Sequence, residues 1–134
     1  MPRQVETNIG NLTFLSSDLV HIKLNNKQHL KVEDGIIFRN TFKKLVDNGI
    51  GIVVDARNVQ VTASPKLMRF FTTDPTFNKL SKFQAIIVNS TSTKLLANFY
   101  VNYLKKKSNA RVFNNYEDAL IWIEDKVKTF SLAN

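Results

Sequence analysis

The residues with the clearest chemical potential lie around one passage from a strand to a helix. Residues 52–71 read IVVDARNVQVTASPKLMRFF, an apolar run that ends at Asp55 and continues to Ser64. Asp55 could contact a ligand, because ligands of open α/β sheets gather beyond the carboxyl ends of strands, or it could cap the turn that follows. Ser64 could cap a helix, or it could carry a phosphate at the positive end of that helix, near Lys66 and Arg69.

Other residue types that do chemistry occur without the partners that the chemistry needs. The chain has no cysteine, which excludes disulfides, thiolate metal sites and cysteine nucleophiles. Its two histidines, His21 on the outward side of an expected strand and His29 in an expected loop, have no set of carboxylates at ligand spacing. The serines lack a nucleophile elbow, and the four glycines form no phosphate-binding loop. We therefore expect no catalytic residues, no cofactor and no metal.

Hydrophobic periodicity predicts strands and helices that alternate along most of the chain. Expected strands cover residues 11–17, 19–25, 50–56, 83–90 and 110–113, and expected helical segments cover residues 31–49, 64–71, 74–80, 91–108 and 114–130. The consecutive apolar residues of the third strand indicate burial on both of its faces, as in the middle of an α/β sheet. The order predicts one domain over residues 1–134, an α/β fold with a mixed sheet of about five strands covered by about four helices.

Aromatic residues concentrate in the expected helical segments of the second half. They are Phe70, Phe71, Phe77, Phe99, Tyr100 and Tyr103. One core-facing side of a helix cannot easily bury so many rings. These residues either pack in the core or leave an exposed apolar patch for a protein partner, for a second copy of the chain or for an acyl-chain ligand.

Three stretches, taken in order, resemble one group of small bacterial domains. They are GIVVDARNV (residues 51–59), FQAIIVNSTSTKLLANFYVNYLKK (residues 83–106) and ARVFNNYEDALIWIED (residues 110–125). These stretches resemble segments of the STAS/SpoIIAA-like domains, which are also described as STAS/SEC14-like. The first is a central strand that ends in aspartate, and the second is a strand that leads through a polar turn to a helix with ANF. The third is a short closing strand before a helix with Ala-Leu-x-Trp. The resemblance implies a SpoIIAA-like fold in a poorly characterised branch.

The resemblance implies two kinds of function. In the SpoIIAA-like antagonists a partner kinase phosphorylates a serine that falls on Ser64 here, which implies a non-enzymatic regulatory or protein-interaction module. The surroundings differ, because Ala63 stands where the family has an acidic residue and Pro65-Lys66-Leu67 replaces a small, glycine-containing helix start. As an alternative, the SEC14-like comparison implies a site between helices for a small apolar or lipid-like ligand.

The overall positive charge favours the binding of anions without selecting a particular one. The formal net charge is +8, but the basic residues are scattered along the chain, and a helix dipole explains the one dense run, residues 105–107. We therefore expect no specific nucleic-acid site. The first ten residues contain no apolar segment typical of signal peptides, and no apolar run approaches the roughly 20 residues of a membrane span. We expect a cytoplasmic protein whose partner is another protein, a second copy of itself or a small apolar ligand.

Overall fold

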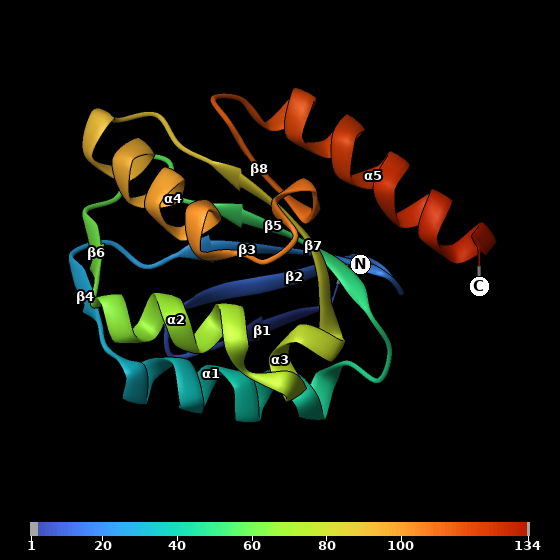
Figure 1. Ribbon diagram of the computed structural model, residues 1–134, viewed down its shortest axis with the longest axis horizontal. Helices are drawn as coiled ribbons and strands as arrows, with labels where there is room; N and C mark the ends of the chain where they lie inside the picture. Colours follow the sequence, from blue (N-terminus) through green and yellow to red (C-terminus); the bar gives the residue numbers. More distant parts are fainter. Residues whose placement is uncertain (1–2, 134) are drawn as a thin grey trace.

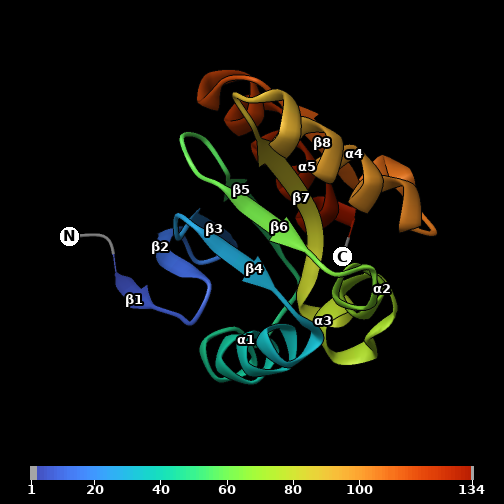
Figure 2. The same cartoon turned by 90° about the vertical axis from the view of Figure 1, so that its left-hand side faces the viewer.

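A six-stranded sheet runs through the middle of the computed structural model, which describes residues 3–133 (Figure 1). Its strands, in spatial order, are β1 (Gln4–Glu6), β2 (Gly10–Ser16), β3 (Leu19–Leu24), β5 (Ile50–Asp55), β7 (Ser81–Ile87) and β8 (Ala110–Phe113). The pairs β1–β2 and β2–β3 are antiparallel, and the pairs from β3 to β8 are parallel. A separate parallel pair joins β4 (Gln28–Leu30) to β6 (Val61–Ala63), at the side of the molecule that Figure 2 shows in front.

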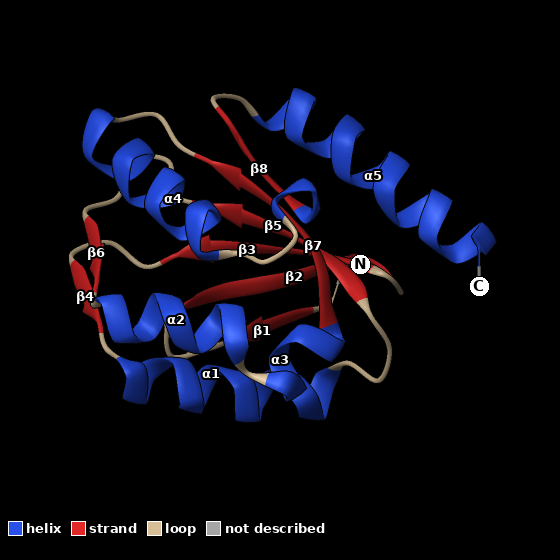
Figure 3. Ribbon diagram, in the orientation of Figure 1, coloured by secondary structure: helices blue, strands red, loops and turns tan. Residues whose placement is uncertain are grey.

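Helices cover both faces of the sheet (Figure 3). One face carries α1 (Val32–Leu45), α2 (Pro65–Thr73), α3 (Pro75–Leu80) and α4 (Thr91–Tyr103). The other face carries α5 (Tyr116–Ala133), and a short 3-10 turn, η1 (Lys107–Asn109), precedes β8. No helix within residues 3–133 is long and apolar enough to cross a bilayer.

Side chains of the central strands alternate between these two faces. Ile52 packs in the core under α1 and α2, whereas its neighbour Val53 packs under α5, and both are at most 3 % exposed. Gly51 lies beneath α5, where a Cβ atom would come within 2.7 Å of Val127 Cγ2 and within 3.0 Å of Ile123 Cγ1. The missing side chain at Gly51 therefore lets α5 pack directly on β5.

Local capping explains where several helices begin. The side-chain oxygens of Ser64, Asp74 and Ser90 accept the backbone N–H three residues later, at the starts of α2, α3 and α4. Asn115 does the same for Asp118 at the start of α5. Each cap satisfies an N–H group that has no partner within its own helix.

The predicted α/β architecture is confirmed, and the structure adds to it. Strands β1, β4 and β6 were not predicted, and each is only three residues long. The expectation of a loop at His29 was wrong, because His29 lies in β4 and its Nδ1 is 2.7 Å from Thr62 Oγ1 of β6. Helix α1 ends at Leu45, four residues before the predicted stop at Gly49.

Candidate functional site

Three basic side chains surround the Asp55 carboxylate at the carboxyl end of β5. His21 Nε2 lies 3.0 Å from Oδ2. Arg57 donates from Nη2 to Oδ2 at 2.9 Å, from Nε to Oδ1 at 3.0 Å and from its backbone N–H to Oδ1 at 3.2 Å. Lys23 Nζ lies 3.9 Å from Oδ1 and donates to the carbonyl oxygen of Arg57. His21 and Lys23 come from β3, whose register puts Lys23 opposite Asp55.

These contacts keep Asp55 ionised although it is only 2 % exposed. Burial raises the pKa of the carboxyl, but the hydrogen bonds from His21 and Arg57 and the charge of Lys23 outweigh it, so the pKa lies well below its usual range. The hydrogen bond to Asp55 in turn raises the pKa of Arg57. The carboxylate thus faces protein groups and accepts the N–H of Arg57, as a turn cap does.

Asp55 was a predicted candidate, whereas the basic side chains around it were not predicted as its partners. His21 lies 34 residues before Asp55, and only the parallel pairing of β3 with β5 brings them together. The alternation of β3 placed His21 and Lys23 together on one face, which was the available signal, but the expectation that this face lies in water was wrong for His21, because α5 covers it and leaves the His21 side chain 21 % exposed. Tyr116, in the first turn of α5, closes the cluster: its ring centroid lies 5.9 Å from both the His21 ring and the Arg57 guanidinium carbon.

Ser64 lies apart from this cluster, at the start of α2. Its Oγ accepts the N–H of Leu67 at 3.1 Å, and its own N–H donates to the carbonyl oxygen of Leu30 at 2.9 Å. Lys66 and Arg69 are exposed on α2, and within residues 3–133 neither forms an ion pair. Ser64, Lys66 and Arg69 therefore lie together at α2, whereas Asp55, the fourth predicted residue, lies in the separate cluster with His21 and Arg57.

Replacing Ser64 with alanine should lower the free energy of unfolding by about 1 kcal/mol, because the N–H of Leu67 loses its acceptor. Ser64→Asp should stay close to the wild type, because aspartate is an equally good cap and its charge suits a helix N-terminus. Urea denaturation measures both effects. Ser17→Ala, at an exposed turn residue, is the control and should change little. Equal stability of Ser64→Ala and the wild type would show that the cap contributes nothing.

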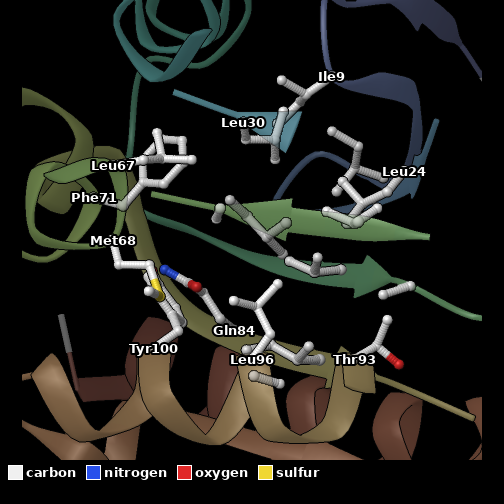
Figure 4. A pocket seen from close by; sticks show the side chains of 18 of the residues that line it. Ile9, Leu24, Leu30, Leu67, Met68, Phe71, Gln84, Thr93, Leu96 and Tyr100 are labelled. Carbon is white, nitrogen blue, oxygen red and sulfur yellow. The ribbon is translucent and has the colours of Figure 1, made fainter. Parts of the chain in front are cut away.

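An apolar pocket lies between the sheet and the helices on the other side from Asp55 (Figure 4). Its volume is about 150 Å³. Helices contribute Phe38, Leu67, Met68, Phe71, Phe77, Thr93, Leu96, Ala97 and Tyr100, and the large sheet contributes Ile22, Leu24, Ile52, Val54, Gln84 and Ile86. Residues 9, 30, 56, 61, 63 and 88 complete the wall. The pocket thus joins three of the predicted aromatic residues with both sheets.

The polar groups of the pocket wall are Gln84, Thr93 and Tyr100. Gln84 Nε2 donates to Ser81 Oγ at 3.1 Å, and Thr93 Oγ1 lies 2.7 Å from Ser90 Oγ. Burial raises the pKa of Tyr100, and its hydrogen bond with Gln84 offsets only part of that rise. The phenol therefore stays neutral, and no charged side chain lines the pocket.

The predicted aromatic residues divide between core and surface. Phe77 is 5 % exposed and its ring centroid lies 4.7 Å from that of Phe71, whereas Phe99 is 60 % exposed and Tyr103 is 40 % exposed. Leu95, four residues before Phe99, is also 60 % exposed. Core packing is thus confirmed for Phe71 and Phe77, and Phe99 and Tyr103 are exposed, while an occupant of their surface stays a prediction.

A metal centre has no counterpart in the part of the chain that the structure describes: no three His, Cys, Asp or Glu side chains within residues 3–133 gather as ligands. The candidate features are therefore the Asp55 cluster, the Ser64 region, the apolar pocket and the exposed side of α4.

Comparison with known proteins supports the fold and leaves the activity open. A family model described as "Domain of unknown function (DUF7793)" matches residues 13–127. The chain is similar to the crystal structure of an uncharacterized protein of the DUF3478 family, with a SpoIIAA-like fold, from Shewanella loihica PV-4. The two are 13 % identical, and the similarity covers 92 % of each chain with a TM-score of 0.52, which confirms the predicted SpoIIAA-like fold. No curated protein matches.

Proposed function

The chain belongs to the DUF7793 family of unknown function, and on that premise we propose that it is a non-enzymatic binding module for a small apolar molecule. The ligand occupies the pocket between the sheet and helices α2 and α4. The observation that carries this proposal is a volume of about 150 Å³ whose wall is apolar except for three uncharged polar side chains.

The volume limits the size of the ligand. A cavity of about 150 Å³ lined by Leu, Ile and Phe accommodates benzene, whereas drug-sized ligands use about 300–1,000 Å³. A single ring or a short aliphatic chain therefore fits the pocket, while a lipid with two full acyl chains is too large.

The wall also limits the polarity of the ligand. Gln84, Thr93 and Tyr100 already have partners within the protein, so a charged ligand would lose its hydration without gaining a counter-charge. The same lack of a charged side chain supports a binding role without catalysis, because acid–base chemistry needs a group that exchanges a proton near neutral pH.

The regulatory role that the family resemblance implies stays a prediction. Ser64 has a structural use as a cap, and phosphate on its Oγ would have to replace the hydrogen bond from Leu67 N–H. Mass spectrometry of protein purified from its native cells would test it, since a phosphoserine at Ser64 would support a switch there.

Binding of benzene, indole or hexane should raise the melting temperature of the protein, because each binds the native pocket and not the unfolded chain. Ala97→Leu should abolish that rise, because Ala97 is 7 % exposed and a leucine there enters the pocket. Asn98→Leu is the matched control, since Asn98 lies on the exposed side of the same helix and should keep the response.

Native mass spectrometry of freshly purified protein, before and after organic extraction, provides the second measurement. A bound mass of one ring or one short chain supports the proposal. The proposal is wrong if no mass is bound and none of the three probes shifts the melting temperature, or if Ala97→Leu responds like the wild type.

A further inference from the structure

The acidic residues of this chain are divided very unevenly along the sequence. Residues 56–116 contain ten lysines and arginines and one acidic residue, Asp74. The remaining residues contain nine basic and ten acidic ones. Asp74 is itself paired with Arg39 of α1, with Arg39 Nη1 2.8 Å from its Oδ1. The whole net positive charge therefore belongs to the segment that includes α2, α4 and the turn after α4.

Part of this charge lies exposed on two neighbouring helices. Helix α2 contacts α4, and both lie in front of the six-stranded sheet in Figure 1. Lys66 and Arg69 on α2, Lys94 on α4 and residues 105–107 after α4 are all exposed. None of these six forms an ion pair with the residues that the structure describes. Their field is therefore available to an external anion.

The exposed side of α4 is also apolar. Leu95, Phe99 and Tyr103 follow one another at intervals of four residues, so they form one stripe, and they are 60 %, 60 % and 40 % exposed. A different side of the same helix carries Ala97 and Tyr100 to the pocket. The α2–α4 face is defined as the stripe together with Lys66, Arg69 and residues 105–107; Lys94 is left out, because it lies about 140° around α4 from Phe99.

We propose that the α2–α4 face docks on the surface of an anionic lipid bilayer. Helix α4 lies along the interface, with Leu95, Phe99 and Tyr103 at the boundary of headgroups and acyl chains. The basic residues lie among the anionic headgroups, where each contributes attraction that falls off within a Debye length. The inference goes beyond ligand binding in the pocket, and it assigns a bilayer as the partner from which an apolar molecule would be taken.

The composition of the face favours a bilayer over a nucleic acid or an acidic protein. Four of its five basic residues are lysines, whose apolar stems can lie against acyl chains while the amines reach the headgroups. Specific nucleic-acid contacts rely more on the planar fork of arginine than on lysine. Phe99 and Tyr103 offer rings on which bases can stack, but the aliphatic Leu95 does not, so an oligonucleotide is included as a competing partner in the test. An anionic bilayer thus offers both a negative charge for the basic residues and an apolar interior for the exposed stripe.

Co-sedimentation of the full chain with vesicles tests the inference. Vesicles of phosphatidylcholine with roughly 30 mol% phosphatidylserine should bind the protein, pure phosphatidylcholine should not, and binding should weaken as NaCl rises from about 0.05 to 0.5 M. Leu95→Ser with Phe99→Ser should weaken binding about tenfold, because both side chains leave water on docking. Ile121→Ser, at a residue 70 % exposed on α5, is the apolar control and should bind like the wild type.

A second pair of variants separates position from net charge. Lys105→Glu with Lys107→Glu should weaken vesicle binding about tenfold or more. Lys43→Glu with Lys128→Glu changes the net charge equally at exposed residues of α1 and α5, and should retain most of the binding. Equal loss in both pairs would overturn the inference, because binding would then follow total charge only.

Two further outcomes would also overturn it. One is tighter binding of a single-stranded oligonucleotide than of the vesicles, if the same variants also lose that oligonucleotide binding. The other is a dimer in analytical ultracentrifugation that Phe99→Ser dissociates, which would make the stripe a contact between two copies. Ala97→Leu should keep vesicle binding while losing the pocket probes, so failure of docking leaves the pocket proposal standing.

Discussion

Asp55→Asn is expected to lower the free energy of unfolding by roughly 2–3 kcal/mol. Asparagine keeps the shape but removes the charge that His21, Lys23 and Arg57 share. The cost stays below that of breaking a fully buried pair, because the side chains of Lys23 and Arg57 are 41 % and 35 % exposed and can turn to solvent. Urea denaturation at neutral pH measures the change, and Asp47→Asn, at an exposed residue, is the matched control.

The same variant should flatten the acid dependence of stability. The pKa of Asp55 is lowered by folding, so its contribution is present above the pKa of an unfolded aspartate, about 3.9. That contribution is lost as the pH falls from there through the lower pKa of the folded state. The wild type should therefore lose its advantage over Asp55→Asn between about pH 5 and pH 2. A constant difference over that interval would show that the charge of Asp55 does not stabilise the fold.

Gly51→Val is expected to lower the free energy of unfolding by about 2–3 kcal/mol. Even a Cβ atom at Gly51 would approach Val127 and Ile123 of α5 within 2.7–3.0 Å, and the two methyl groups of valine need further space. The extra volume has to be accommodated by moving α5 away from β5. Valine is otherwise a good strand residue, so intrinsic propensity would predict the opposite sign.

The only tryptophan of the chain makes this change observable. Trp122 lies on α5, with its ring centroid 5.7 Å from that of Phe113 on β8. Displacement of α5 should shift the Trp122 emission to longer wavelength together with the loss of stability. Gly49→Ala is the control, because the three atoms nearest to its Cβ would all belong to the flexible side chain of Lys82. Wild-type stability and emission in Gly51→Val would show that α5 is not packed as described.

The parts of the fold that were predicted well have signals in neighbouring residues of the sequence. Ser64 before Pro65 and Asp74 before Pro75 each combine a cap with a proline at the first helical position, so α2 and α3 are visible without knowledge of distant residues. The three-residue strands β4 and β6 have no such signal. His29 and Thr62 become strand residues only because they pair across 33 positions.

The candidate sites show the same limit. Strand alternation predicted that His21 points away from the core, but its contact with Asp55 depends on which strands are neighbours. The uneven distribution of acidic residues is visible in the sequence itself, but the positions of the basic residues alone do not show it. The family resemblance implied an apolar site between helices, but the lining residues and the volume of the pocket could not be predicted, because that volume is a small difference between the space inside the wall and the side chains that fill it.

The ends of the six-stranded sheet limit how copies of this protein can assemble. The outer strand at one end, β1, has three residues and includes Glu6, and the outer strand at the other end, β8, has four residues and includes the exposed Arg111. Short, charged edges are poor templates for adding a strand from another chain. Extension of the six-stranded sheet into fibres through these two edges is therefore disfavoured.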